Sequence, residues 1–208
     1  MIDLHTHLLP GVDDGAQTTE QAAAVLGKFH EYGVTTVCCT PHLKASELAE
    51  APCEDLDELL KELAAAAPVA PKLVRIKAQG LIPLLAHPER YAVCSVEQAA
   101  RWREAGAVLQ IDATTLLTDT KRAERARDLL TAGYGTIIAS DNHGDGRSMA
   151  AAVEWMESHG AREQARLLAY ENPSAILSDV VTMDVPPVRL RRSWYSMLKD
   201  FVIGGKDV

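Results

Sequence analysis

The chain has 208 residues, of which 47% are hydrophobic and 24% charged, and its formal net charge is −8. This length fits one domain with a continuous core, and the composition argues against extended disorder. The acidic balance disfavours a phosphate backbone as ligand, so we expect no nucleic-acid partner. No stretch of about eighteen uninterrupted apolar residues occurs, and Asp3 and His5 stand where a leader would need basic and apolar residues. We therefore expect a cytoplasmic protein without a transmembrane segment.

Short β-branched runs alternate with longer stretches of helical period. Strands are expected over 1–5, 35–40, 81–86, 108–112 and 136–140. Helices are expected over 18–32, 54–66, 96–105, 120–132, 147–158 and 161–169. This alternation is typical of βα units around a mainly parallel sheet, so the sequence predicts an α/β fold. The cysteines show no C-x-x-C spacing and are expected to be reduced core residues: Cys38, Cys39, Cys53 and Cys94.

Five of the seven histidines follow the carboxyl ends of expected strands, together with aspartates. In chain order these residues are His5, His7, Asp13, Asp14, His42, His87, Asp141 and His143. Because such ends meet on one face of a parallel sheet, we expect these side chains to converge. Burying so many imidazoles and carboxylates together is costly without a cation. The sequence therefore predicts a site for several metal ions.

The types of ligand limit the metal and its chemistry. Imidazole with carboxylate and without thiolate suits manganese, iron or zinc. Two or three such ions can activate water and stabilise an in-line displacement at phosphorus. Arg90 follows His87 by three residues and Arg147 follows His143 by four, so both are candidates to hold phosphate oxygens. The simpler alternative for each arginine is a surface ion pair. Together these residues predict metal-dependent hydrolysis of a phosphoester.

Several longer motifs occur in a fixed order. They are DLHTHLLPGVDDGA (3–16), GVTTVCCTPH (33–42), GLIPLLAHPERY (80–91), LQIDATTLL (109–117), IIASDNH (137–143) and ENPSAIL (171–177). With these motifs the chain resembles the polymerase-and-histidinol-phosphatase superfamily. More narrowly, it is similar to the bacterial manganese-dependent tyrosine-protein phosphatases of capsule and exopolysaccharide synthesis.

The resemblance implies a distorted, TIM-like (β/α)7 barrel over residues 1–180, followed by a C-terminal tail over 181–208. It implies two or three manganese ions and hydrolysis of phosphotyrosine on an autophosphorylating kinase of polysaccharide export. Arg90 and Arg147 would lie near the phosphate. The implied metal ligands are His5, His7, one or both of Asp13 and Asp14, His42, His87, Asp141 and His143.

The sequence departs from the family between Lys72 and Gly80. There the family has a strand that ends in a Gly-x-Glu ligand and a later strand that supplies another acid. Here PKLVRIKAQG runs directly into GLIPLLAHPERY, and no Glu occurs between Glu62 and Glu89. We therefore expect one or two central strands and two carboxylate ligands to be absent. Their loss predicts a weakened metal position and open strand edges, which favour self-association.

Two alternatives to a tyrosine phosphatase remain open. One is a phosphoesterase for a small molecule such as histidinol phosphate. The other is a catalytically impaired remnant that binds the kinase or a metal without turnover. The expected loss of two acids favours the remnant, whereas the intact HxH, PH, HPER and SDNH motifs favour an active enzyme.

Overall fold

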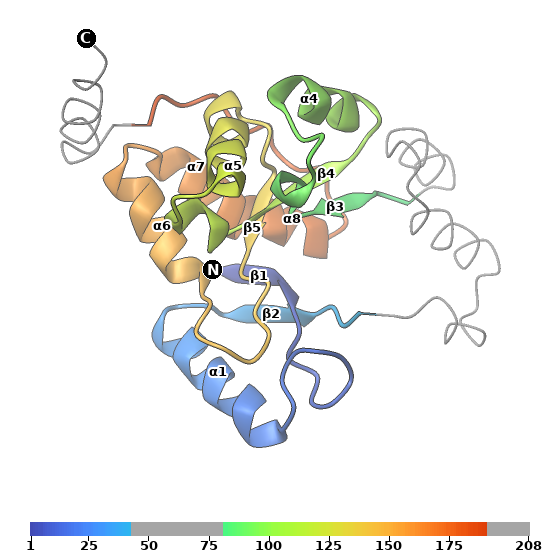
Figure 1. Ribbon diagram of the computed structural model, residues 1–208, viewed down its shortest axis with the longest axis vertical. Helices are drawn as coiled ribbons and strands as arrows, with labels where there is room; N and C mark the ends of the chain where they lie inside the picture. The colour runs from blue at the N-terminus through green and yellow to red at the C-terminus, as the bar shows by residue number, and fades with distance from the viewer. Residues whose placement is uncertain (43–80, 191–208) are drawn as a thin grey trace, which may run out of the picture.

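The computed structural model describes residues 1–42 and 81–190, shown in colour in Figure 1. Its strands are β1 (Ile2–Thr6), β2 (Thr36–Cys39), β3 (Leu84–Ala86), β4 (Val108–Asp112) and β5 (Ile137–Ala139). Its α-helices are α1 (Thr19–Glu31), α4 (Val96–Glu104), α5 (Lys121–Ala132), α6 (Met149–Ser158), α7 (Arg162–Arg166) and α8 (Asn172–Leu177). Shorter turns are η2 (Pro88–Arg90), η3 (Thr115–Leu117) and the π-helical η4 (Leu167–Glu171). The expected helix over 54–66, Cys53 and the segment 72–80 lie outside the described residues.

All strand pairs are parallel. β1 pairs with β2, and β3, β4 and β5 form a three-stranded sheet with β4 in the centre. The two sheets meet beyond β5, where Thr6 bridges to Asn142 and the His7 N–H donates to the Asn142 carbonyl oxygen at 2.7 Å. The expected α/β class is therefore present. The described strands do not by themselves close a barrel.

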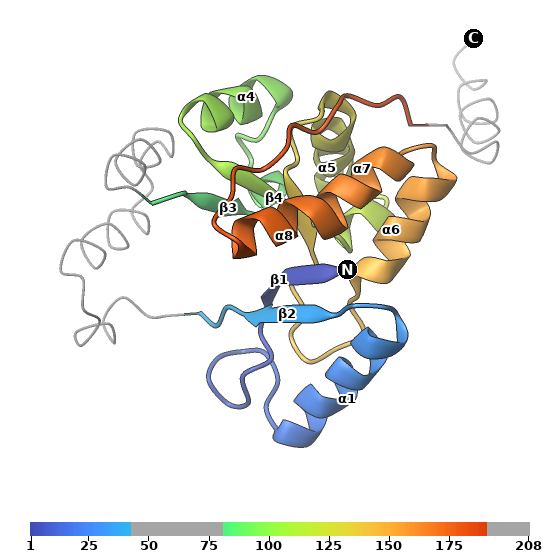
Figure 2. The same ribbon diagram turned by 180° about the vertical axis from the view of Figure 1, so that it is seen from behind.

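Helices lie on both sides of the three-stranded sheet. Figure 1 shows α5 in front of the strands, and the reverse view in Figure 2 shows α7 and α8 in front of them.

Serine or threonine caps start four helices, since Thr18, Ser95, Thr120 and Ser148 accept hydrogen bonds from amides of the first turn. The starts of α1, α4, α5 and α6 therefore lie within two residues of the expected positions.

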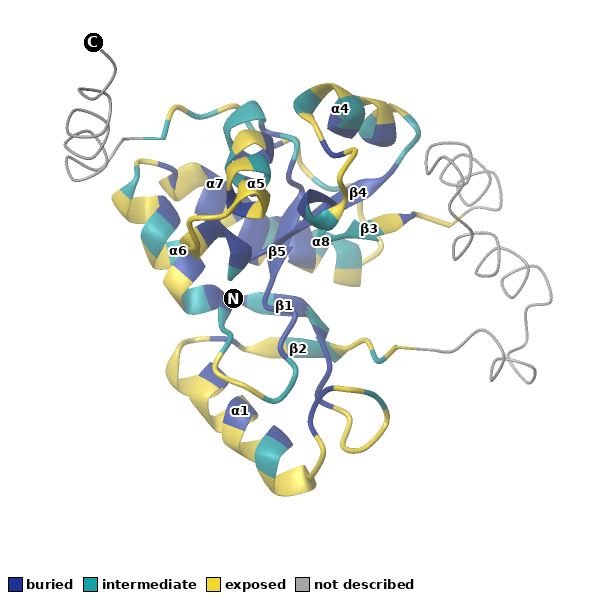
Figure 3. Cartoon of the chain, in the orientation of Figure 1, coloured by how far each residue is buried: buried dark blue, intermediate teal, exposed yellow. Residues whose placement is uncertain are grey.

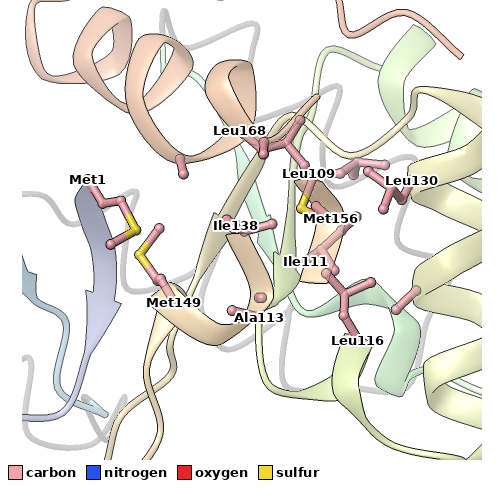
Figure 4. Close-up of a cluster of buried hydrophobic side chains, with 14 of the residues drawn as sticks. Met1, Leu109, Ile111, Ala113, Leu116, Leu130, Ile138, Met149, Met156 and Leu168 are labelled. Carbon is pink, nitrogen blue, oxygen red and sulfur yellow. The ribbon is translucent and has the colours of Figure 1, made fainter. Parts of the chain in front are cut away.

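The core centres on β4 and β5. Every residue of β4 is buried, because β4 pairs on both edges and is covered by helices (Figure 3). Leu109, Ile111 and Ile138 pack with Met156 and Leu168 from the helices (Figure 4). By contrast, β2 and β3 are mostly half-buried or exposed. The strand ends of the buried centre are thus held by packing that the outer strands lack.

The last described helices differ from expectation in one element. Helix α8 continues beyond the expected end at 169, after the π-helical turn η4. Asn172 explains this, because its buried amide donates to the carbonyl oxygens of Thr136 and Met183, both at 3.0 Å. The described residues after 181 also pack on the domain. Val185 is buried, and Gln164 donates to the Pro186 carbonyl oxygen at 2.9 Å.

The cysteines only partly follow the sequence expectation. Cys94 is buried, whereas Cys38 is half-buried and Cys39 is exposed. The difference arises because β2 pairs only with β1 among the described strands, so one side of it is uncovered. No helix in the described residues is long and apolar enough to cross a membrane.

Candidate metal centre

The predicted ligands come together at the carboxyl ends of β1, β2, β3 and β5, in two adjacent groups. An inner group consists of His5, His87 and Asp141. An outer group consists of His7, Asp14, His42 and His143. Within each group, one nitrogen or oxygen of every side chain lies within 4.8 Å of the others.

The two groups meet at the HxH motif of β1. The Nε2 atoms of His5 and His7 are 3.2 Å apart, and Oδ1 of Asp141 is 3.4 Å from each of them. The His7 and His143 rings stack with their centroids 4.0 Å apart. Several electron-pair donors therefore face one small volume, an arrangement that a cation stabilises.

Hydrogen bonds at Nδ1 orient three of these rings. His5 Nδ1 is 2.8 Å from Oε1 of Gln110, His7 Nδ1 is 2.6 Å from Oδ2 of Asp13, and His143 Nδ1 is 2.8 Å from the Asp141 carbonyl oxygen. Each oxygen is an acceptor, so in the neutral ring Nδ1 carries the proton. Nε2 then keeps its lone pair free for a metal, the usual state of a histidine ligand held by an outer hydrogen bond.

The adjacent aspartates of the GVDDG motif have different surroundings. Asp13 accepts hydrogen bonds from the His7 ring, from the His42 amide at 2.8 Å and from the Gly15 amide at 2.9 Å. Burial opposes its ionisation, but these bonds outweigh burial and lower the pKa of Asp13 to about 2. Asp14 instead points its Oδ1 at Nε2 of His42 and of His143, at 3.5 and 3.6 Å. Asp14 therefore lies among the ligand atoms, and Asp13 orients the histidines from behind.

Gly15 allows this loop to fold back on β1. A Cβ atom at position 15 would collide with the backbone and Cβ of His7. The Ala16 amide donates to the His7 carbonyl oxygen at 2.8 Å, which ties the loop to the strand end. Only glycine fits so close an approach, so the motif places Asp13 and Asp14 beside the histidines.

Two ligand positions of the inner group have strained backbones. His87 has φ 37° and Asp141 has φ 50°, in the left-handed region that non-glycine residues rarely adopt. Burial and the nearby Arg90 charge lower the pKa of His87 to about 4, so its ring is neutral near neutral pH. Its buried Nδ1 has no hydrogen-bond partner among the described residues. Such strain at strand ends is common where side chains must be aimed at a site.

Both predicted arginines lie beside Asp141. Arg90 Nη2 contacts Oδ2 of Asp141 and is 3.0 Å from Oδ2 of Asp112. Burial opposes its charge, but these carboxylates outweigh burial and raise the pKa of Arg90. Arg147 Nη1 is 3.5 Å from Oδ2 of Asp141, and its Nε is 2.8 Å from Oδ2 of Asp145. The arginines thus form ion pairs and at the same time border the ligand groups.

Two residues near the centre, Gln110 and Asp112, were not predicted as part of the site. Gln110 holds His5, and Asp112 holds Arg90. The sequence contained a signal for both, since they are two apart on β4, the spacing used for His5 and His7. Glu89, from the HPER motif, is fully buried, and its Oε1 accepts from the Asp112 amide at 3.0 Å. Burial raises the pKa of Glu89 to about 7.

The donor set fits a divalent transition metal. Imidazole nitrogens and carboxylate oxygens without thiolate suit manganese, iron or zinc. The hydrogen bonds at Nδ1 of three histidines leave their Nε2 atoms available to a metal. The two adjacent groups can hold at least two ions. Arg90 and Arg147 lie beside the inner group, where both contact Asp141.

Comparisons with known proteins agree with this geometry. A solved chain from the crystal structures of YwqE from Bacillus subtilis and CpsB from Streptococcus pneumoniae, described as metal-dependent tyrosine phosphatases, has the same fold with a TM-score of 0.74. That match covers 92% of this chain and 100% of the other at 22% identity, so it bears on the fold alone. The tyrosine-protein phosphatase CpsB of S. pneumoniae is 36% identical over 58 residues, which are 28% of this chain and 24% of that protein.

A family model supplies the broader match. The family described as capsular polysaccharide synthesis, CpsB/CapC, matches residues 1–73 and 64–178. These stretches contain every residue of the two ligand groups and both arginines. The chain therefore belongs to the CpsB/CapC family of capsular polysaccharide synthesis proteins.

Proposed function

We propose that this protein is a metal-dependent phosphatase that hydrolyses phosphotyrosine in a protein substrate. The observation that carries the proposal is the convergence of seven ligand side chains beside two arginines at one end of a parallel sheet. Membership of the CpsB/CapC family and the names of the matched relatives support the same reaction.

The inner and outer groups would hold the metal ions. A bound ion would supply Lewis acidity and lower the pKa of a bound water. Manganese is the ion that the family resemblance favours, with iron and zinc as alternatives. Arg90 and Arg147 bind the non-bridging oxygens of the phosphoryl group and balance the charge that develops during the displacement. Asp112 and Asp145 keep the two guanidinium groups in place, since each accepts a hydrogen bond from one of them.

We further propose the finer features that the family resemblance implies. The catalytic domain spans residues 1–180 and forms a distorted (β/α)7 barrel that lacks one or two central strands. Its substrate is an autophosphorylating tyrosine kinase of polysaccharide export, and it acts in the cytoplasm. The parallel pairing of all described strands supports the barrel.

A second candidate is a protein that binds metal or the kinase without turnover. The sequence between Glu62 and Glu89 contains no acidic residue, so carboxylates that bridge ions in the family have no counterpart there. The family model also matches in two overlapping stretches that meet at residues 64–73, close to this segment. These observations support the second candidate, and manganese binding without hydrolysis would distinguish it from the phosphatase.

Hydrolysis of a phosphotyrosine peptide by the chelator-treated protein, titrated with manganese, separates these candidates. Saturable activity that is lost in His87→Ala, with an unchanged circular dichroism spectrum, supports the phosphatase. Manganese binding without hydrolysis, in a folded protein, supports the second candidate. Histidinol phosphate serves as comparator, and faster turnover of it than of the peptide would contradict a protein substrate.

A further inference from the structure

A hollow of about 640 Å³ opens between the end of α1, the turn η3 and the start of α6. Its walls include Tyr32 after α1, Leu117 at the end of η3, and Arg147 and Glu154 around the start of α6. The loop that leads from β5 to α6 passes α1 in both views of the ribbon (Figures 1 and 2). The hollow is thus a groove between segments far apart in the sequence.

Two wall residues of the groove are connected by hydrogen bonds or ion pairs to residues of the metal centre. Arg147 lines the groove and also reaches Asp141 of the inner group at 3.5 Å. Thr114 lines it as well, and its Oγ1 donates to Asp112 at 2.8 Å, the carboxylate that holds Arg90. A phosphoryl group bound by Arg147 would therefore lie beside this groove.

Hydrogen bonds hold the walls in place without a ligand. The buried Asn142 amide donates to the carbonyl oxygens of Asp145 and Arg147 at 3.2 and 2.7 Å. Oδ1 of Asp145 accepts from the Arg147 amide at 2.9 Å, and Gln21 of α1 donates to the Gly144 carbonyl oxygen at 2.8 Å. The loop, and with it the groove, is therefore preformed, which lowers the entropic cost of binding.

The wall residues define the chemistry of an occupant. Tyr32 and Leu117 are large apolar side chains left 52% and 39% exposed, so they offer contact to an apolar group. Glu154 is exposed and forms no ion pair with any described residue. The groove thus combines an arginine at the metal end, an apolar wall and the exposed Glu154 carboxylate. This pattern complements a phosphate, an apolar side chain and a basic side chain.

We propose that this groove binds the polypeptide next to the phosphotyrosine and selects substrates with an apolar residue and a lysine or arginine near it. The proposal rests on the phosphatase function proposed above and names its substrate class. Two or three extended residues span roughly 7–10 Å, which a hollow of this size accommodates. A small phosphomonoester fills only the arginine end, so the groove contributes to the affinity of peptides alone.

Charge reversal at Glu154 tests the proposal on the manganese-loaded protein. Substrates are phosphotyrosine peptides with leucine and lysine, or leucine and glutamate, placed at each position from three before to three after the phosphotyrosine. Glu154→Lys is expected to raise KM for the best lysine peptide about tenfold, because the attraction between Glu154 and the peptide lysine is replaced by repulsion. KM for the glutamate counterpart should fall, because the new lysine attracts the peptide glutamate. Free phosphotyrosine has no neighbouring residues, so its KM should change less than the KM of either peptide.

Glu157→Lys is the matched control, since Glu157 is exposed on the same helix and does not line the groove. Peptide preference that is equal in the parent protein and in Glu154→Lys would overturn the proposal. A peptide with a phosphonate in place of the phosphate gives a second readout, its affinity measured by fluorescence anisotropy. If Glu154→Lys weakens binding of this peptide but no substrate is hydrolysed, the groove binds peptide and the phosphatase proposal is wrong. If the parent protein does not bind the peptide, the groove proposal is wrong.

Discussion

The inner and outer ligand groups are built differently. The inner group stands on strand ends, where Asp141 is buried, His5 is held by Gln110, and His87 and Asp141 have left-handed backbones. The outer group draws on loops, and the side chains of Asp14 and His42 are 70% and 64% exposed. Buried packing therefore sets the inner geometry before metal arrives, whereas parts of the outer group are ordered by few contacts.

The contrast has a consequence for metal binding. A preformed ligand set loses little conformational entropy on binding, while exposed side chains must be immobilised by the ion itself. We therefore expect the first manganese ion to bind at the inner group and a later ion to bind more weakly at the outer group. The expected lack of acids between Glu62 and Glu89 adds to this difference, because bridging carboxylates balance charge between ions.

The largest effect is expected for His87→Ala, which removes a ligand of the inner group. Loss of an outer hydrogen-bond partner typically costs 10- to 100-fold in metal affinity or activity, so loss of a ligand should reduce manganese-dependent hydrolysis by more than about 100-fold. The measurement is peptide hydrolysis over a manganese titration. His30→Ala, on the exposed side of α1, is the control, and equal rates in the two variants would contradict the inner site.

A smaller effect is expected for Gln110→Leu, because it keeps the ligands and removes the acceptor at His5 Nδ1. Manganese affinity, measured by calorimetry on the chelator-treated protein, should fall roughly 10- to 100-fold. Gln110→Glu retains an acceptor oxygen and should restore much of the affinity. If both variants bind manganese as the parent does, the hydrogen bond does not orient His5.

For the outer group, Asp14→Asn should raise the manganese concentration needed for half-maximal activity by about tenfold, since one charged ligand is lost. At saturating manganese the rate should approach that of the parent. Thermal stability should stay the same, because the Asp14 side chain is exposed. A loss of activity as complete as that of His87→Ala would mean that the two groups are equally important, and would break the comparison.

The smallest effect is expected for Asp112→Asn, which changes the partner of Arg90 and no ligand. KM for a phosphotyrosine peptide should rise only several-fold, because asparagine keeps an oxygen that accepts from Arg90 and only the charge of the carboxylate is lost. The manganese dependence should not change. The double variant with Arg90→Lys should be no worse than Arg90→Lys alone, and additive losses would show that Asp112 acts independently of Arg90.

Much of the fold follows from local sequence. β4 begins and ends where expected, because the segment with Val108, Leu109 and Ile111 is flanked by Gly106 before it and by a turn after it. The expected strand over 81–86 begins only at Leu84, since Leu81 and Ile82 are 48% and 66% exposed and have no strand partner among the described residues. Helix α8 was not expected, because the long-range hydrogen bonds of Asn172 hold it and no local pattern encodes them.

The sequence by itself determined which residue types stand at the strand ends, because HxH and SDNH follow directly from where strands stop. Only the tertiary structure distinguished Asp14 from Asp13, because the sequence does not show which of two adjacent carboxylates accepts hydrogen bonds. In the structure, Asp13 accepts from the His7 ring and from two backbone amides. It also added Gln110 and Asp112, whose roles depend on contacts with residues 105 and 22 positions away. Such contacts arise from packing of the whole sheet, and no local pattern specifies them.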